Sequence, residues 1–174
     1  MIKNYKQLLK KITTIILDVD GVLTDGSVLI AQNGEQLRTM HVKDGYALQL
    51  AVKKGYRVVI MSGGRSDVLE GRFNYLGIKE VYLGLTNKLE LFENYIKNNH
   101  LQSSEILYIG DDIPDYEIMN RVGVACCPAD AVEEIKKICH YISPFTGGTG
   151  CVRDVLEQIM KVQAKWFDSE AFSW

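Results

Sequence analysis

Continuous apolar runs alternate along the chain with segments whose apolar residues recur every three or four positions. The runs at 15–17, 58–61 and 106–109 are rich in Ile and Val and carry no charged residue. Such runs are typical of strands that are buried on both faces of a parallel sheet. The segment at 87–99 instead places its apolar residues on one stripe of a helix. The alternation predicts an α/β fold, in which helices cover both faces of a Rossmann-like parallel sheet.

The expected elements follow one another in strand–helix order. Strands are predicted at residues 13–20, 56–64, 81–84, 105–112, 123–128 and 140–144. Helices are predicted at residues 45–55, 66–77, 87–99, 115–122, 131–138 and 150–166. No linker or low-complexity segment interrupts this order, so we expect residues 1–174 to form a single domain.

One segment breaks the α/β rhythm. Asn33-Gly34 lies between the strand-like stretches VLIAQ at 28–32 and EQLRTMHV at 35–42. Both turn residues tolerate a positive φ, which a tight hairpin turn requires. The sequence therefore predicts a β-hairpin that forms a flap beside the main sheet.

Carboxylates follow two of the predicted strands directly. Asp18 and Asp20 end the first, and Asp111 and Asp112 end the strand at 105–112, with Asp115 close behind. The carboxyl ends of parallel strands meet at one edge of the sheet, which is where α/β proteins bind ligands. A single aspartate there is often a turn or helix-capping residue. Several aspartates close together repel one another through their negative charges unless a hard cation binds between them. Mg2+, which prefers oxygen ligands, is the natural candidate.

Residues that can bind an anion lie at the end of the strand predicted at 56–64 and at the start of the helix predicted at 87–99. Ser62 is followed by Gly63 and Gly64, which offer a hydroxyl and accessible backbone N–H groups at a helix start. Lys88 begins the helix predicted at 87–99. Each feature alone is common in loops and on surfaces. Together with a metal ion they indicate a site for a phosphoryl group.

The overall composition narrows the class of protein without identifying it. Of the 174 residues, 47% are hydrophobic and 24% are charged, and the formal net charge is -2. This balance gives no general attraction to nucleic acids or anionic membranes. No apolar run approaches the roughly 20 residues of a membrane span, and the start of the chain lacks the apolar core of a signal peptide. We therefore expect a cytoplasmic protein.

Four stretches in order resemble the motifs of the haloacid dehalogenase superfamily of phosphatases. They are DVDGVLTDG at 18–26, Ser62, Lys88 and GDDIPD at 110–115. The stretches NGEQLRTMHVKDGYALQLA, SGGRSDVLEGRFNYLGI and TGGTGCVRDV resemble the small branch of this superfamily that has no cap domain. Only 25 residues separate Ser62 from Lys88, which are too few for a cap.

The resemblance implies a reaction and a substrate class. It implies Mg2+-dependent hydrolysis of 3-deoxy-D-manno-octulosonate 8-phosphate to the free sugar acid and phosphate, a step in making lipopolysaccharide precursors. Relatives that act on nine-carbon ulosonate 9-phosphates, of the sialic-acid or KDN type, leave an alternative open. Octulosonate phosphatases often carry a basic residue at the position of Gly64, and some nine-carbon relatives carry an acidic one. The absence of an acidic residue there favours the eight-carbon sugar.

The resemblance also assigns roles to the aspartates. It implies that Asp18 is the nucleophile, which forms an aspartyl phosphate, and that Asp20 is the general acid and base. Mg2+ would be bound by the Asp18 carboxylate, the Asp20 backbone carbonyl and Asp111. Asp112 and Asp115 would lie behind these ligands or orient the lysine of the third motif.

The phosphoryl group and the sugar acid need further contacts. The resemblance places the phosphoryl oxygens against Ser62, Gly63 and Lys88. The carboxylate of a sugar acid needs additional cations, although an arginine or lysine taken singly is more often a surface or ion-paired residue. The candidates for binding it are Arg65, Arg72, Lys43 and Arg153. Arg65 is favoured because it follows Ser62 so closely.

The resemblance further implies a homotetramer. In the resembled family four subunits assemble through the hairpin, and the C-terminal segment of a neighbour covers each site. The apolar stretch at 28–32 and the aromatic residues in the tail at 166–174 are suitable parts for such an assembly. The alternative is an aromatic tail that packs on its own domain or is disordered.

Two other classes of protein share part of this pattern. A phosphorylation-dependent receiver domain also uses acidic residues, Ser or Thr, Lys and Mg2+, but in a different order along the chain and without a hairpin. A noncatalytic relative, acting in oligomerisation or sugar binding, would show the loss of a catalytic residue. None of the motif residues is missing from this sequence.

Overall fold

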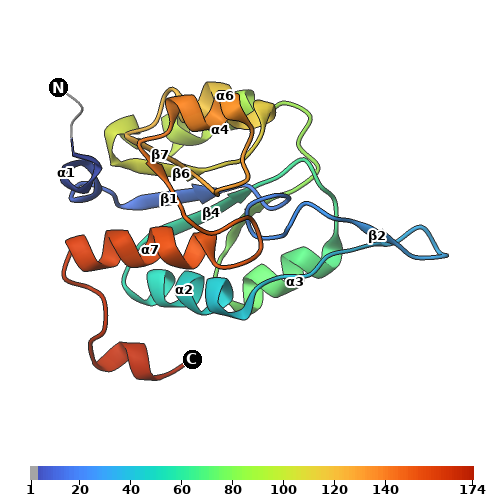
Figure 1. Ribbon diagram of the computed structural model, residues 1–174, viewed down its shortest axis with the longest axis horizontal. Coiled ribbons are helices and arrows are strands. Elements are labelled where there is room, and N and C mark those ends of the chain that lie inside the picture. The colour runs from blue at the N-terminus through green and yellow to red at the C-terminus, as the bar shows by residue number, and fades with distance from the viewer. Residues whose placement is uncertain (1–3) are drawn as a thin grey trace.

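A six-stranded parallel sheet forms the centre of the computed structural model, which describes residues 4–174 (Figure 1). The strand order is β5-β4-β1-β6-β7-β8. The strands are β1 (Thr14–Leu17), β4 (Arg57–Met61), β5 (Glu80–Tyr82), β6 (Ile106–Ile109), β7 (Val124–Cys127) and β8 (Tyr141–Ile142). The chain builds outward from β1 to β5 on one side and then returns to place β6 on the other. The carboxyl end of β1 is therefore the point at which the strand order reverses, the usual position of a binding crevice.

Helices cover both faces of the sheet, as the sequence pattern predicts (Figure 1). One face carries α1 (Tyr5–Leu9), α2 (Val42–Lys53), α3 (Asp67–Tyr75) and α7 (Cys151–Val162). The other face carries α4 (Lys88–Asn98), α5 (Tyr116–Met119) and α6 (Glu133–Ile138). Among residues 4–174 there are also three short 3-10 helices, η1 (Ser103–Glu105), η2 (Ile113–Asp115) and η3 (Ser169–Phe172).

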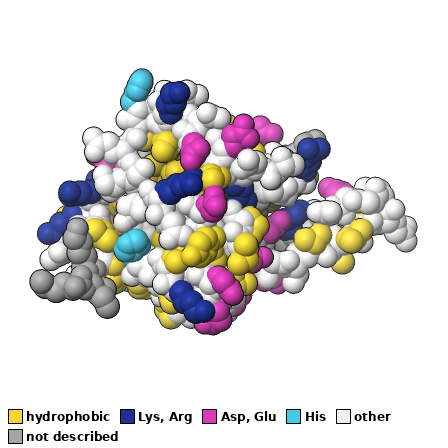
Figure 2. Space-filling view, turned by 90° about the horizontal axis from the view of Figure 1, so that it is seen from above, with side chains coloured by type: hydrophobic (Ala, Val, Ile, Leu, Met, Phe, Trp, Pro, Cys, Tyr) yellow, Lys and Arg dark blue, Asp and Glu magenta, His cyan; other side chains and the backbone are white. Residues whose placement is uncertain are grey.

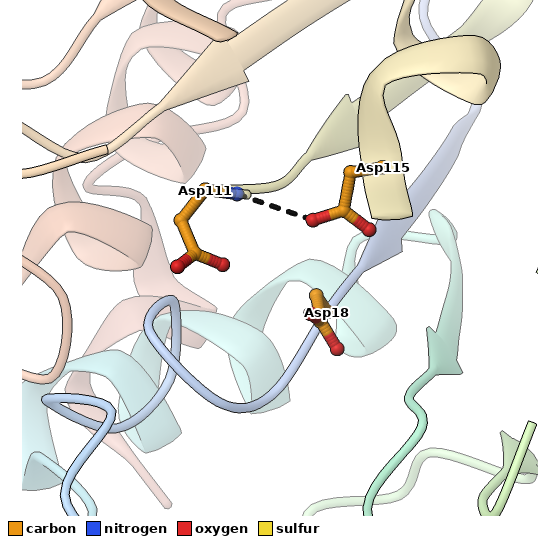
Figure 3. A group of neighbouring side chains, drawn as sticks. All are labelled: Asp18, Asp111 and Asp115. Atoms are coloured by element: carbon orange, nitrogen blue, oxygen red, sulfur yellow. Dashed lines mark hydrogen bonds between the residues drawn. The ribbon is translucent and has the colours of Figure 1, made fainter. Parts of the chain in front are cut away.

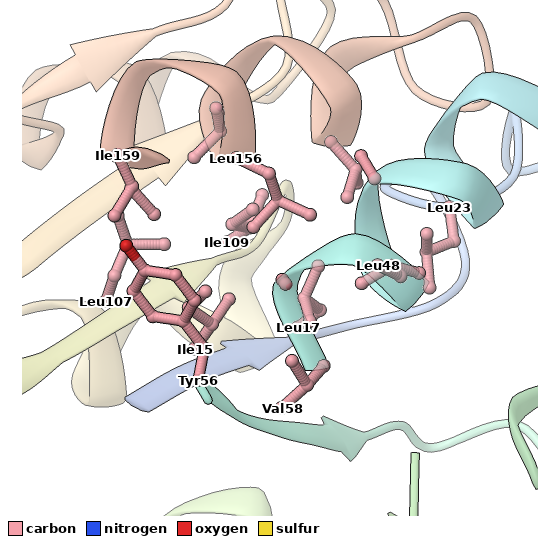
Figure 4. Close-up of a cluster of buried hydrophobic side chains, with 14 of the residues drawn as sticks. Ile15, Leu17, Leu23, Leu48, Tyr56, Val58, Leu107, Ile109, Leu156 and Ile159 are labelled. Carbon is pink, nitrogen blue, oxygen red and sulfur yellow. The ribbon is translucent and has the colours of Figure 1, made fainter. Parts of the chain in front are cut away.

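Strand β1 shows how the apolar run divides between two cores. Ile15 and Leu17 belong to the cluster under α2 and α7, which Figure 4 shows in close-up, whereas Ile16 belongs to the cluster under α4 and α5. All three side chains are fully buried. Successive residues of a strand point to opposite faces, so an uninterrupted apolar run serves both cores.

The hairpin is present, but its strands are shorter than the sequence predicts. Strands β2 (Leu29–Ile30) and β3 (Gln36–Leu37) pair in antiparallel fashion around Gly34, which has a φ of +82°. The chain leaves β3 after Leu37 and enters α2 at Val42. The hairpin forms an arm that projects from the body of the molecule and carries hydrophobic side chains (Figure 2). On this arm Leu29 and Ile30 are 68% and 71% exposed.

Two further predictions differ from the structure in detail. The helix predicted at 115–122 is the 3-10 turn η2 followed by the single turn α5. The last helix, predicted to reach residue 166, ends at Val162, after which the chain folds back.

Within residues 4–174 the interval between β4 and α4 holds only α3 and β5, so there is no cap domain there. None of the described helices is long and apolar enough to cross a membrane.

The aromatic tail packs on its own chain, in line with the second alternative for this segment. The Tyr46 hydroxyl donates to the Ala171 carbonyl, and Lys53 Nζ donates to the Ser173 carbonyl at 3.0 Å. The ring of Trp174 meets the ring of Tyr46 edge-on, with centroids 5.6 Å apart. These contacts hold the tail against α2.

Candidate active site

A cavity of about 790 Å3 opens at the carboxyl ends of the central strands. The predicted residues that line it are Asp18, Asp20, Ser62, Gly63, Lys88, Asp111 and Asp112. They come from the loops that follow β1, β4 and β6 and from the first turn of α4. The fold therefore brings together the acidic and the anion-binding groups that the sequence places at separate strand ends.

Three carboxylates form a compact group (Figure 3), and two of them, Asp18 and Asp111, line this cavity. One oxygen from each of Asp18, Asp111 and Asp115 lies within 4.8 Å of the others. Asp111 Oδ1 is buried and has no hydrogen-bond partner among residues 4–174. Burial, together with the charges of Asp115, Asp18 and Asp112, raises the pKa of Asp111 to about 7. An orphaned carboxylate oxygen amid like charges is what a hard divalent cation would satisfy.

Lys88 lies between two of these carboxylates. Its Nζ is 2.7 Å from Asp18 Oδ2 and 2.8 Å from Asp115 Oδ1. Burial alone would lower the pKa of Lys88, but the charges of Asp115 and Asp18 outweigh it and raise that pKa. The ammonium group is therefore held in its charged form beside Asp18. Its position is fixed because Lys88 begins α4, whose N-cap Asn87 accepts a hydrogen bond from the backbone N–H of Glu90 at 3.1 Å.

Asp115 is engaged on both oxygens and acts as a support. It is fully buried and accepts hydrogen bonds from the Tyr108 hydroxyl at 2.7 Å and from the Asp111 backbone N–H at 3.2 Å, in addition to Lys88. Asp112 is the N-cap of η2, where its side chain accepts from the Ile113 N–H. Asp115 therefore contacts Lys88 directly, whereas the side chain of Asp112 caps η2.

The second aspartate of the first motif has a different partner. Arg38, from the arm after β3, donates from Nε to Asp20 Oδ1 at 2.6 Å and from Nη2 to Asp20 Oδ2 at 3.0 Å. The Asp20 side chain is not part of the three-carboxylate group. Sequence reasoning missed Arg38 because only the fold-back of the hairpin brings it to the strand end.

Ser62 and Gly63 line another part of the cavity. Ser62 is 2% exposed, and its Oγ accepts from the Gly64 backbone N–H at 3.3 Å. At Gly21 the backbone comes so close to Asp111 that a Cβ would lie 2.0 Å from Asp111 Oδ2. Asp25, at the end of the first motif, lies outside the site as a turn residue whose side chain accepts from the Ser27 N–H at 2.9 Å.

The four cations expected to bind a substrate carboxylate do not line this cavity. Arg65 lines a neighbouring groove and packs beside Gly84. Arg72 lies over the ring of Tyr75. Lys43 and Arg153 line a separate cavity of about 390 Å3. In that cavity Arg153 lies over the rings of Tyr46 and Trp166 and pairs with Glu157 at 3.0 Å.

Fold and site together define a class of protein. A parallel α/β sheet whose reversal point holds clustered carboxylates, a buried lysine and a buried serine is equipped for metal-assisted phosphoryl transfer. The model of the haloacid dehalogenase-like hydrolase family matches residues 73–155.

Individual relatives agree with this class. The 3-deoxy-D-manno-octulosonate 8-phosphate phosphatase of Escherichia coli K12 is 35% identical over 156 residues, which cover 90% of this chain and 83% of the relative. The chain therefore belongs to the haloacid dehalogenase-like hydrolases.

Solved structures show the same similarity. The enzyme of that name from Yersinia pestis has a TM-score of 0.90 at 34% identity, covering 94% of this chain and 88% of the other. The one from Moraxella catarrhalis, in complex with magnesium, phosphate and KDO, has a TM-score of 0.90 at 32% identity, covering 96% and 94%.

Proposed function

We propose that this protein is a magnesium-dependent phosphatase that hydrolyses 3-deoxy-D-manno-octulosonate 8-phosphate to the free sugar acid and inorganic phosphate. The observation that carries this proposal is the group of Asp18, Asp111 and Asp115, with its unpartnered buried oxygen, beside the charged Lys88. The similarity to octulosonate phosphatases over most of both chains supports the choice of substrate.

The donor set fits a magnesium ion. The Asp18 carboxylate, the Asp111 carboxylate and the Asp20 backbone carbonyl would hold it, and all three residues line the same cavity. When bound, the ion supplies positive charge that stabilises the phosphoryl oxygens in the transition state. Asp115 is less suited to be a ligand because both its oxygens already accept hydrogen bonds.

Asp18 and Asp20 carry out different steps of the reaction. A carboxylate oxygen of Asp18 attacks phosphorus, so that an O–P bond to Asp18 forms as the bond from phosphorus to the sugar oxygen breaks. Asp20 gives a proton to the departing sugar oxygen. A water molecule then attacks the phosphorus of the aspartyl phosphate, Asp20 takes a proton from that water, and inorganic phosphate leaves with the Asp18 carboxylate restored.

The other residues hold the reacting group. Lys88 and the Ser62 hydroxyl line the cavity close to Asp18 and would donate to phosphoryl oxygens, together with the Gly63 backbone N–H. Asp115 keeps Lys88 in place through the 2.8 Å ion pair, and Tyr108 in turn fixes Asp115.

The setting of this reaction is a cytoplasmic step in making lipopolysaccharide precursors, carried out by a homotetramer. The cavity is open to solvent in one chain, and a neighbouring subunit would shield it from bulk water. The apolar arm, with Leu29 and Ile30 exposed, supplies a surface for such an assembly.

Parallel kinetics on octulosonate 8-phosphate and on a nine-carbon ulosonate 9-phosphate test the proposal. The eight-carbon substrate should be hydrolysed with the higher kcat/KM, and Asp18→Asn should abolish turnover while the circular dichroism spectrum stays that of the wild type. Phosphate release by Asp18→Asn at the wild-type rate would exclude the mechanism, and a preference for the nine-carbon substrate would exclude the sugar.

A further inference from the structure

Hydrogen bonds from all three nitrogens of its guanidinium group hold Arg38 in one position. Besides its two bonds to Asp20, it donates from Nη1 to the Gln36 carbonyl at 3.2 Å and from Nη2 to Gln36 Oε1 at 3.3 Å. Its side chain is 4% exposed. A planar fork that grips a carboxylate with two parallel bonds is the strongest arrangement that arginine offers.

A side chain at position 64 would fit beside this pair only if the neighbouring side chains shifted by a few tenths of an ångström. A Cβ on Gly64 would lie 3.0 Å from Asp20 Oδ2 and 3.1 Å from Arg38 Nη2. Both distances are shorter than an ordinary van der Waals contact between carbon and a polar atom. The guanidinium of Arg38 therefore fills the space into which a residue at position 64 would project.

The pair lies at the junction of two hollows. Asp20 lines the cavity of about 790 Å3, whereas Gln36 and Gly64, both of which Arg38 approaches, line a groove of about 690 Å3 between the arm and the loop after β4. Gly63 lines both. Arg38 itself lines neither hollow, but it contacts Asp20 in the cavity and Gln36 in the groove, so a molecule that extends from one hollow into the other would pass beside it.

The cavity itself has little charge to offer a second anionic group. Its lining carries one cation, Lys88, against the carboxylates of Asp18, Asp20, Asp111, Asp112 and Glu117. Lys88 already forms ion pairs with Asp18 and Asp115. A sugar acid that enters by its phosphate would bring its carboxylate past Asp20, where an unpaired anion is strongly disfavoured.

We propose that Arg38 binds the carboxylate of the substrate and gives up Asp20 to do so, an inference that rests on the proposed function. Exchanging one carboxylate for another keeps the guanidinium paired. It also frees the Asp20 oxygens, which then face the ester oxygen of the sugar. A phosphate ester with no carboxylate leaves the Arg38–Asp20 pair closed, and Arg38 thereby determines specificity for sugar acids.

The test compares two phosphates that have the same kind of leaving group. Octulosonate 8-phosphate and D-mannose 6-phosphate are both esters of a primary hydroxyl, but only the first carries a carboxylate. Arg38→Met should lower the ratio of their kcat/KM values by about 10- to 100-fold, the range for charge-assisted hydrogen bonds. It should also weaken the binding of the free sugar acid, measured by calorimetry, by a similar factor.

Two further variants keep the result interpretable. Arg38→Lys retains the charge but not the fork, so it should recover part of the ratio and serves if Arg38→Met does not fold. Arg57→Met is the matched control, because Arg57 pairs with Glu80 at 2.7 Å at the opposite end of β4. This control should leave the ratio and the binding of the sugar acid at wild-type values.

The outcomes separate this inference from the proposed function. An equal loss on both substrates by Arg38→Met would mean that Arg38 only positions Asp20, and would overturn the inference. An unchanged ratio with unchanged binding would overturn it as well. A wild-type protein that hydrolyses mannose 6-phosphate but not octulosonate 8-phosphate would instead refute the proposed substrate.

Discussion

Replacing Lys88 by Met tests whether one buried cation holds the site together. The side chain of Lys88 is 7% exposed, and its Nζ lies 2.7 and 2.8 Å from Asp18 and Asp115. Removing one partner of a buried ion pair costs about 3–5 kcal/mol of unfolding free energy, because the other charge stays buried without compensation. For 174 residues, at about 3 °C per kcal/mol, this lowers Tm by roughly 9–15 °C. Loss of a donor to the phosphoryl oxygens should lower kcat by about 100- to 1000-fold.

The assay is thermal unfolding with and without Mg2+, together with phosphate release. Mg2+ should raise Tm more for Lys88→Met than for the wild type, since the variant leaves the carboxylates more negative and the ion neutralises them. Lys136→Met is the control, because Lys136 pairs at 3.3 Å with the exposed Glu133 and should change the unfolding free energy by less than about 1 kcal/mol. A Tm drop no larger than that of the control, with kcat unchanged, would refute this account of Lys88.

Three further changes have defined outcomes. Gly21→Ala should abolish Mg2+-dependent phosphate release without unfolding the protein, because its Cβ would meet Asp111 Oδ2 at 2.0 Å, and activity near wild type would contradict this contact. Tyr108→Phe removes the 2.7 Å hydrogen bond to the buried Asp115 and should lower the unfolding free energy, measured with urea, by about 1–2 kcal/mol; no change would contradict it. Burial raises the pKa of Asp44, so the stability that its protonated form contributes is present below pH 4 and is lost as the pH rises through that raised pKa. Asp44→Asn should therefore gain stability relative to the wild type in urea unfolding as the pH rises above 4, whereas a constant difference would exclude this linkage.

The parts of the site that depend on strand ends could be predicted from the sequence. Asp18, Ser62 and Asp111 each follow an apolar run, and parallel strands necessarily bring such residues to one edge. The apolar run at 15–17 likewise predicts a strand that lies between two layers of helices. These features are local in the sequence, so a single pattern predicts both the element and the position of its terminal residue.

The parts that depend on how loops fold back could not be predicted. Arg38 reaches Asp20 only because β3 ends after two residues and the chain turns inward. Arg65 follows Ser62 closely in the sequence, yet it packs beside Gly84 and not in the cavity. The position of Tyr108 under Asp115 depends on the face of β6 on which it lies, which an apolar run without alternation does not reveal.

Trapping the covalent intermediate tests the central claim most directly. The protein is mixed with octulosonate 8-phosphate and Mg2+, quenched in acid within milliseconds, and digested for mass spectrometry. The account predicts a phosphoryl group on Asp18, in the peptide that contains β1, and none when Mg2+ is chelated. Turnover without a phosphorylated Asp18, or a phosphoryl group on another residue, would contradict it.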